Sequence, residues 1–267
     1  MNTAAPVDVI MPVYNGIEHL QGLLPKVIGD PMVARLIIID DASPDPEVTA
    51  FLDEQAQSCR RIELIRHGSN YGFVRSVNRG LQLATRDIIL LNTDVDVPKG
   101  WVERLMRPIF QSPRVASTTP FSNAATILSF PEAQVDNSAF SDIPVAAIDS
   151  QFQKLTCENL PALELPTGVG FCMGIARDAI ERVGVLDEEN FGRGYGEEND
   201  WCQRAIEAGY VHMPVTNLYV HHDHGGSFDE AEKRQLLDRN LKTLQKRHPG
   251  YHQQVADFIQ RDPLAGY

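Results

Sequence analysis

The sequence predicts an α/β protein with a doubly wound, mainly parallel β-sheet. Its first half contains apolar runs rich in Val, Ile and Leu, and each run ends near a polar or turn residue. Segments with a helical spacing of apolar residues separate these runs. Uninterrupted apolar runs are typical of parallel strands that helices cover on both faces. Strands and helices that alternate in this way form right-handed βαβ units, which together build one open sheet.

The expected elements follow from these patterns. The predicted strands of the first half are residues 7–11, 36–39, 62–65 and 88–91, and the predicted helices between them are 17–28, 46–57 and 73–84. An irregular segment follows from Pro120 to Leu165, with one short helix near 146–155. We then expect a strand within 169–176, helices over 178–183 and 199–208, and a strand over 211–220. The tail over 229–260 is amphipathic and helical, with a break at Pro249-Gly250.

The composition excludes some classes of function. The chain has 267 residues and a formal net charge of −12, whereas a nucleic-acid surface needs clustered Lys and Arg. No apolar run is long enough for a transmembrane helix, and the first residues lack the basic flank and apolar run of a signal peptide. The cysteines are scattered without metal-ligand spacing, which indicates reduced thiols in a cytoplasmic protein.

Polar side chains gather where the predicted parallel strands end. Ligands of an open parallel sheet bind beyond the carboxyl ends of its strands, at the point where the strand order reverses. The candidate residues at these ends are Tyr14, Asn15, Asp40, Asp41, Asn70 and the run from Asn92 to Asp96. A cap or a turn explains any one of them, but their occurrence after separate strands predicts a shared ligand site.

Asp94 and Asp96 form a candidate metal site. They lie two residues apart just after a predicted buried strand, so in an extended segment both carboxylates project to one side while Val95 faces the core. Two carboxylates on one side suit Mg²⁺ or Mn²⁺, and such an ion stabilises the charge of a diphosphate. The alternative is a pair of solvated turn residues.

A second acidic cluster begins a predicted helix in the second half. Glu197, Glu198 and Asp200 follow the glycine-rich run from Gly192 to Gly196. The helix dipole favours negative charge in a first turn, so capping explains one or two of these residues. Three acids exceed what capping needs, and a carboxylate held here can remove a proton from an attacking hydroxyl as a general base.

Three histidines cluster near the end of the predicted strand 211–220. His221, His222 and His224 are potential metal ligands, and one imidazole would complete a set of carboxylate and phosphate oxygens around Mn²⁺. A zinc site and a purely structural role are the alternatives. Adjacent histidines on a strand point to opposite faces and no cysteine lies near, so at most part of the cluster meets one ion.

In this order, the motifs resemble glycosyltransferase family 2, a large family of inverting enzymes with the GT-A fold. The resemblance runs from about Val7 to about Ser227. The segments that carry it are Val9 to Gly16, Ile38 to Asp45, Asn70 to Phe73 with Asn78 to Gly80, Asn92 to Trp101, and Thr167 to Cys172. Asn70 to Gly80 and Asn92 to Trp101 resemble the branch that contains rhamnosyl- and galactofuranosyltransferases.

The resemblance implies a role for each candidate residue. The implied nucleotide-binding residues are Pro12, Val13, Tyr14, Asn15, Asp41, Asn70, Arg75, Asn92, Thr93, Asp94 and Val95. At the metal, Asp96 is the implied direct ligand with His222, whose partner is Ser227, while Asp94 contacts the ribose or a metal-bound water. Glu198 takes the position of the base, with Glu197 as the alternative, while Asp200 orients the acceptor or Arg204. Gly168 and Trp201 are implied in acceptor binding.

The resemblance also implies a function and a domain organisation. The chain is expected to move a sugar from a UDP- or dTDP-sugar to a hydroxyl of a glycan or lipid-linked glycan, with Mn²⁺ or Mg²⁺ and with inversion. A GT-A domain would span 1–228, with a nucleotide-sugar half over about 1–118 and an acceptor half over about 119–228. Residues 229–267 would form a C-terminal helical extension. The setting is expected to be polysaccharide biosynthesis in the cytoplasm, with the inner membrane face and a homodimer left open.

Two rival functions are considered. A sugar nucleotidyltransferase shares an acidic metal site but needs a basic, glycine-rich loop after the first strand, and residues 12–16 contain no Lys or Arg. The other rival is a non-catalytic module that binds a nucleotide-sugar. The intact acidic motifs at Asp94–Asp96 and at Glu197–Asp200 disfavour a module that has lost its activity.

Overall fold

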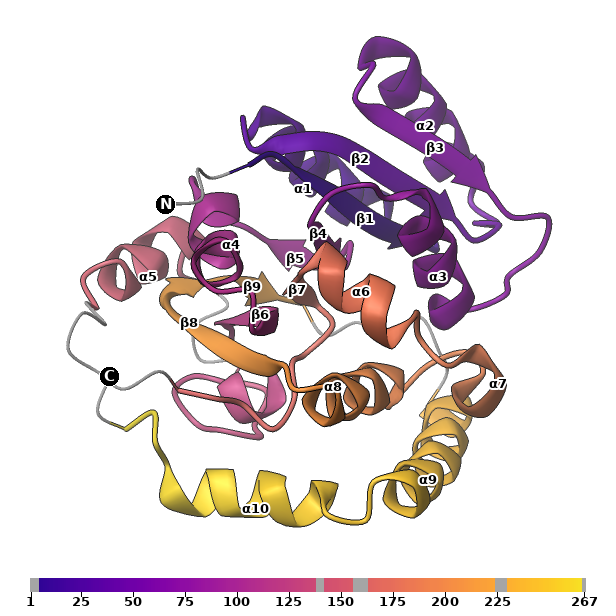
Figure 1. Cartoon of the computed structure of the whole chain (residues 1–267). Coiled ribbons are helices and arrows are strands. Elements are labelled where there is room, and N and C mark those ends of the chain that lie inside the picture. Colours follow the sequence, from indigo (N-terminus) through magenta and orange to yellow (C-terminus); the bar gives the residue numbers. More distant parts are fainter. Residues whose placement is uncertain (1–4, 138–141, 156–162, 224–229, 266–267) are drawn as a thin grey trace.

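The chain folds around a seven-stranded, mainly parallel β-sheet (Figure 1). The computed structural model describes residues 5–137, 142–155, 163–223 and 230–265. The order across the sheet is β3 (Ile62–Arg66), β2 (Val33–Asp40), β1 (Val7–Val13), β4 (Ile88–Leu91), β7 (Cys172–Ile175), β6 (Val115–Phe121) and β8 (Val211–Tyr219). Neighbours pair in parallel except β7, which is antiparallel to both β4 and β6. The predicted α/β fold is confirmed.

Helices cover the sheet because its central strands bury successive residues. Val9, Ile10 and Met11 of β1 are all fully buried, which requires cover on both faces. The helices of the first half are α1 (Ile17–Gly29), α2 (Pro46–Ser58), α3 (Phe73–Leu83) and α4 (Trp101–Gln111). Those that follow are α5 (Val145–Phe152), α6 (Arg177–Val183), α7 (Glu188–Phe191) and α8 (Glu197–Glu207), with the 3₁₀-helix η1 at Thr126–Leu128. The predicted helices therefore match the structure to within a few residues.

The strand order reverses between β1 and β4, where β1 continues into β2 on one side and β4 lies on the other. A crevice forms at such a point because the loops after the two strands diverge. A small second sheet lies beyond the end of β4, where β5 (Val95–Asp96) pairs antiparallel with β9 (His221–His222). The polar residues after β1 and β4 are therefore brought to one edge of the molecule.

Two helices follow the sheet at the C-terminal end of the chain. The predicted break at Pro249-Gly250 separates α9 (Glu230–Arg247) from α10 (Tyr251–Arg261), and α9 lies beside α7 and α8 (Figure 1). Leu244 and Tyr251 pack with Phe191 of α7 in a small apolar cluster. The predicted domain boundary at 228 falls outside the described residues. Within the described residues, no helix has the length and apolar character needed to span a membrane.

Candidate functional site

A cavity of about 580 Å³ opens at the strand-order reversal. Its walls come from the loops after β1, β2 and β4, the segment before β7, the start of α8 and residues of the 124–136 segment. The cavity therefore joins residues from both halves of the chain. The sequence-predicted residues that line it are Pro12, Val13, Tyr14, Asp41, Asn70, Asn92, Thr93, Asp94, Glu197, Glu198 and His222.

Asp94 and His222 face each other in this cavity. The backbone pairing of β5 with β9 places Val95 opposite His222, and Asp223 N donates to Asp94 O at 2.7 Å. The His222 Nδ1 atom lies 2.8 Å from Ala124 O, so it carries the hydrogen and leaves Nε2 as the acceptor in the neutral ring. His222 Nε2 then points at Asp94 Oδ1, 3.4 Å away, and Phe171 stacks on the ring at 5.0 Å between centroids.

The space between Asp94 and His222 favours positive charge. Burial lowers the pKa of His222, but the Asp94 carboxylate and the Ala124 carbonyl raise it by more, so the pKa lies above its ordinary value. Asp94 Oδ1 is buried and has no short hydrogen bond among the described residues. Two ligands each about 2.1 Å from one ion lie about 3 Å apart, so a 3.4 Å separation fits a shared cation.

Asp96 lies away from this pair. Its carboxylate accepts a hydrogen bond from Lys26 of α1, and it does not line the cavity. Asp96 sits opposite His221 across the small sheet, and His221 Nε2 lies 2.9 Å from Asp223 Oδ1. The expectation that Asp94 and Asp96 face one site together is not met in this geometry. Direct coordination by Asp96 stays a prediction, and its suggested companion Ser227 lies outside the described residues.

Three predicted nucleotide-binding residues do not line the cavity, and their side chains make other contacts within the protein. Asn15 accepts a hydrogen bond from Asp45 N at 3.3 Å and so joins the loops after β1 and β2. The Arg75 guanidinium lies 3.9 Å from the centre of the Tyr71 ring and is half exposed. Val95 is buried in the core, as its position between the two aspartates predicts.

Asp41 organises the loop that carries Asn70. Its carboxylate accepts hydrogen bonds from Tyr71 N at 2.9 Å and Gly72 N at 2.7 Å, and His67 Nδ1 lies 2.7 Å away. Carboxylate oxygens have further lone pairs, so these contacts leave capacity for a ligand in the cavity that Asp41 lines. Contact between Asp41 and a nucleobase stays a prediction.

Glu197 and Glu198 begin α8 and both line the cavity. Each has a buried carboxyl oxygen, Oε2, with no hydrogen-bond partner among the described residues. Buried carboxyl oxygens are seldom left unsatisfied, so this pair marks the place of a ligand. The backbone of Gly170 runs beside Glu198, because a Cβ atom added to that glycine would lie 3.9 Å from Glu198 Cγ.

The two carboxyl groups differ in charge. Burial raises the pKa of Glu197 well above its ordinary value, and the charge of Glu198 raises it further. Burial also raises the pKa of Glu198, whereas backbone N–H groups at the helix start and a hydrogen bond from Glu197 lower it in part. Neighbouring buried carboxyls do not both ionise easily, and the pKa of Glu197 is raised more strongly than that of Glu198, so we assign the shared proton to Glu197.

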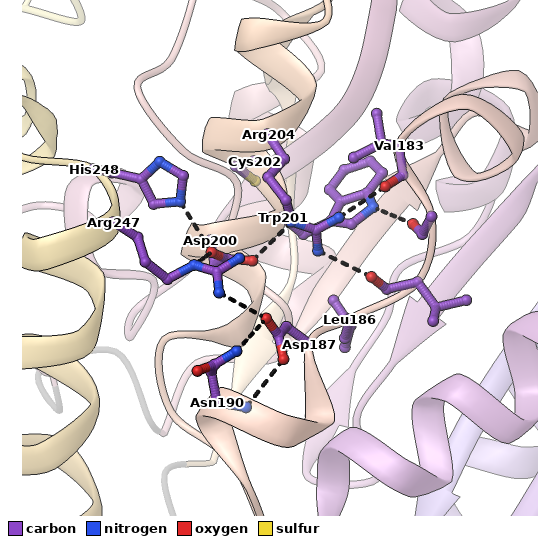
Figure 2. Close-up of polar contacts among 12 residues, drawn as sticks. Val183, Leu186, Asp187, Asn190, Asp200, Trp201, Cys202, Arg204, Arg247 and His248 are labelled. Carbon is purple, nitrogen blue, oxygen red and sulfur yellow. Dashed lines mark hydrogen bonds and ion pairs between the residues drawn. The ribbon is translucent and has the colours of Figure 1, made fainter.

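Asp200 does not line the cavity, so of its two predicted roles the contact with Arg204 is present, whereas orientation of the acceptor stays a prediction. It is fully buried outside the cavity, and its oxygens lie 2.8 Å from Arg204 Nε and 2.9 Å from both Arg247 Nε and His248 Nε2 (Figure 2). These ion pairs satisfy the buried carboxylate and tie α8 to the end of α9.

Trp201 and Gly168 are packing residues rather than cavity residues. Trp201 is 1% exposed and its indole N–H donates to Gly184 O at 2.9 Å (Figure 2). A Cβ atom at Gly168 would lie 2.8 Å from Met173 Cε, so glycine allows close packing there. Neither lines the cavity, and the prediction of direct acceptor contact is not supported for either. The resemblance implied this contact for both residues, but both positions are buried.

Several cavity residues were missed by the sequence reasoning. The most informative are Phe171, Arg193, Tyr195, Asp136 and Leu237. Arg193 and Tyr195 stand inside the glycine-rich run, whose left-handed backbone was a usable signal. Asp136 and the other lining residues of 124–136 lie in an irregular segment without periodicity, and Leu237 belongs to a helix assigned to an extension. Only folding brings these residues to the site.

The fold is an open sheet with a cavity at its strand ends, and the cavity holds a cation-favouring pair and a buried carboxyl pair, which are groups that an enzyme acting on an anionic ligand needs. The chain belongs to glycosyl transferase family 2, because the model of that family matches residues 8–184. The pre-mycofactocin glycosyltransferase of Mycobacterium tuberculosis is 29% identical over 250 residues, covering 91% of this chain and 48% of the relative. N-acetylgalactosaminyltransferase 7 of Drosophila melanogaster is 23% identical, covering 88% and 42%. The chain thus spans less than half the length of these relatives.

Solved structures have the same fold. GalNAc-T7 with UDP, GalNAc and Mn²⁺ superposes with a TM-score of 0.65 at 18% identity, covering 83% of this chain and 44% of the other. The mannosyltransferase PcManGT of Pyrobaculum calidifontis, in complex with GDP-Man and Mn²⁺, also has a TM-score of 0.65 at 15% identity, covering 97% and 71%. The predicted GT-A fold is confirmed. Among the described residues of this chain, no three His, Cys, Asp or Glu side chains form a ready-made metal site.

The raised pKa of Glu197 predicts how stability depends on pH. Its protonated form stabilises the folded state fully below the ordinary Glu pKa of about 4.3, and this contribution is lost as pH rises through the folded-state pKa. A tenfold change in the acid dissociation constant on folding corresponds to roughly 1.4 kcal/mol. Glu197→Gln keeps the shape without the titration, so its free energy of unfolding should fall less between about pH 5 and pH 8.

Urea unfolding at a series of pH values measures this difference. Glu189→Gln is the matched control, because Glu189 is exposed on neighbouring α7 and should leave the pH dependence unchanged. Equal pH profiles for the wild type and Glu197→Gln would contradict the assignment of the buried proton to Glu197.

Proposed function

We propose that this chain is a glycosyltransferase that moves a sugar from a nucleotide-diphosphate-sugar to an acceptor hydroxyl, with inversion at the anomeric carbon. One observation carries the proposal: a single cavity holds the cation-favouring pair Asp94 and His222 together with the carboxyl pair Glu197 and Glu198. A leaving diphosphate needs the first kind of group, and an attacking hydroxyl needs the second. Membership of glycosyl transferase family 2 supports the same activity.

Residues of the first half would bind the nucleotide. Pro12, Val13, Tyr14 and Asp41 line the cavity from the ends of β1 and β2, where an open sheet binds nucleotides. Asn92 and Thr93 line it from the end of β4, next to Asp94. We assign the diphosphate to the side of the cavity next to Asp94 and His222, and the sugar to the space between this pair and Glu198.

The donor set at Asp94 and His222 fits a divalent cation, either Mn²⁺ or Mg²⁺. Carboxylate and imidazole suit such ions, and diphosphate oxygens and water would complete the shell. A bound cation would neutralise charge that develops on the departing diphosphate. The Mn²⁺ in the two structural neighbours supports this assignment. The Ala124 carbonyl fixes the ring of His222, as the outer partner of a metal-binding histidine does.

Glu198 would act as the general base. Its carboxylate takes the proton of the acceptor hydroxyl as that oxygen bonds to the anomeric carbon, while the bond from that carbon to the diphosphate oxygen breaks. The raised pKa of Glu198 makes it a stronger proton acceptor than an ordinary glutamate. Protonated Glu197 supplies a hydrogen bond that keeps Glu198 ionised and oriented.

The rival functions fit the cavity less well. A nucleotidyltransferase would need several basic groups for a triphosphate, whereas the described lining contains Arg193 as its guanidinium and has no Lys. A binding module without activity has no use for a buried carboxyl pair that is costly to maintain. The donor sugar and its UDP or dTDP carrier are proposed on family grounds, as are a glycan or lipid-linked acceptor and a role in polysaccharide biosynthesis at the inner membrane face.

Glu198→Gln tests the base. We expect a loss of transfer of about 10²-fold or more, because proton removal fails while the shape of the site is kept. Binding of the nucleotide in the presence of Mn²⁺ should stay near the wild-type value, since the proposed nucleotide and metal contacts come from other residues. Sugar release from a panel of nucleotide-sugars, together with calorimetric titration of UDP, measures both quantities.

Exposed Glu189→Gln serves as the control and should retain wild-type turnover. If Glu198→Gln turned over as fast as the wild type, the base assignment would be refuted. If the wild type bound no nucleotide and released no sugar from any member of the panel, the proposed function itself would fail.

Asp94→Ala and Asp96→Ala test which of the two aspartates binds the metal. Loss of Asp94 should weaken Mn²⁺-dependent UDP binding by roughly 10- to 100-fold, the usual effect of disturbing a metal site. Asp96→Ala removes an ion pair with Lys26 that is partly exposed, so UDP binding should stay close to the wild-type value. Calorimetry with and without chelator measures the effect, and the reverse order of the two variants would restore Asp96 as the ligand.

A further inference from the structure

The glycine-rich turn before α8, Gly192–Gly196, has an unusual backbone conformation. Gly192, Gly194, Tyr195 and Gly196 have φ values of 64°, 152°, 71° and 96°, so left-handed conformations dominate the turn. Tyr195 is not a glycine, so its positive φ is a strained conformation that surrounding contacts must hold. The turn leads directly into Glu197 and Glu198. Its shape therefore decides where these two carboxyl groups lie.

The side-chain amide of Asn240 in α9 donates hydrogen bonds to the backbone of this turn. The side chain is 1% exposed, and Nδ2 lies 2.9 Å from Phe191 O, 2.7 Å from Gly194 O and 2.9 Å from Tyr195 O. One amide group thus donates to carbonyls at both ends of the turn. Its own Oδ1 accepts from Arg239 Nε at 3.0 Å, so its orientation is fixed.

Further contacts on two sides hold the turn between α9 and the start of α3. Arg247 Nε and His248 Nε2 bind Asp200 of α8, and Arg247 Nη1 lies 2.9 Å from Asp187 Oδ2, the residue that caps α7 (Figure 2). On the opposite side, Arg193 Nη2 donates to Asn70 Oδ1 at 2.8 Å, and Phe73 N donates to Arg193 O at 3.0 Å. A shift of the turn would move the base helix and the wall of the cavity together.

We propose that Asn240 is a positioning residue: its amide holds the Gly192–Gly196 turn in the shape that places Glu197 and Glu198 in the cavity. The proposal rests on the proposed function for its kinetic consequence, but not for its structural one. Helix α9 is then part of the catalytic unit, and Leu237, one turn before Asn240, lines the same cavity. Helix α9 is therefore more than an extension of the domain.

Asn240→Asp is the sharpest variant, because it keeps the volume and replaces the donor with a carboxylate that faces three carbonyls. Asn240→Ala is the second variant, since it removes the donor without adding a buried charge. Leu241→Ala, at a position that is 45% exposed on the same helix, is the matched control. Hydrogen–deuterium exchange of residues 192–198 measures the turn, and steady-state kinetics with UDP titration measure the site.

We expect faster exchange confined to residues 192–198 and a fall of kcat on the order of tenfold or more, with UDP affinity unchanged, because misplacing a catalytic group by about 1 Å is already costly. Wild-type exchange and wild-type kcat in both Asn240 variants would overturn the proposal. Loss of UDP binding together with faster exchange across the whole chain would also overturn it, because that marks a general structural role. If the wild type itself had no activity, the proposed function would fail, and the exchange measurement alone would decide the role of Asn240.

Discussion

The pairing of β4 with the antiparallel strand β7 is the constraint on which the site depends. Asn92 N donates to Phe171 O at 2.8 Å, just beyond the pairing of Leu91 with Cys172, so the segment after β4 is fixed against the segment before β7. Phe171 stacks on His222, and neighbouring Gly170 lies beside Glu198. One short segment, Gly170–Phe171, therefore contacts both His222 and Glu198.

The electrostatics of the cavity follow from this arrangement. Asp94 makes the buried ring of His222 favour a positive charge, and the buried carboxyls of Glu197 and Glu198 share a proton. Both pairs cost folding free energy, since unsatisfied charged groups are unfavourable in a protein interior. The proposed ligands, a cation with a diphosphate at the first pair and a hydroxyl at the second, would relieve both costs, so a net charge of −12 is compatible with the proposed donor.

The strands and helices could be predicted because burial repeats along the sequence, and the acidic and histidine clusters because charge is rarely buried without cause. The contacts of the individual site residues could not be predicted from the sequence. Asp94 and Asp96 have the same local pattern, but α1 supplies Lys26 to Asp96 and the β5–β9 pairing directs His222 to Asp94. Asp200 belongs to the acidic cluster in the sequence, but in the fold its carboxylate contacts Arg247 and His248, which are distant in the sequence. Trp201 turned inward for the same reason: tertiary packing decides which face of a helix is buried.

The proposed reaction depends most on a cation held by Asp94 and His222, which anchors the donor across the cavity from Glu198. Anomalous scattering from Mn²⁺ in crystals grown with UDP tests this most directly. We expect an anomalous peak inside the cavity, within coordinating distance of Asp94 Oδ1 and His222 Nε2 and in contact with the diphosphate. A peak beside Asp96 and Lys26, or UDP bound in the cavity with no Mn²⁺ next to Asp94, would contradict it.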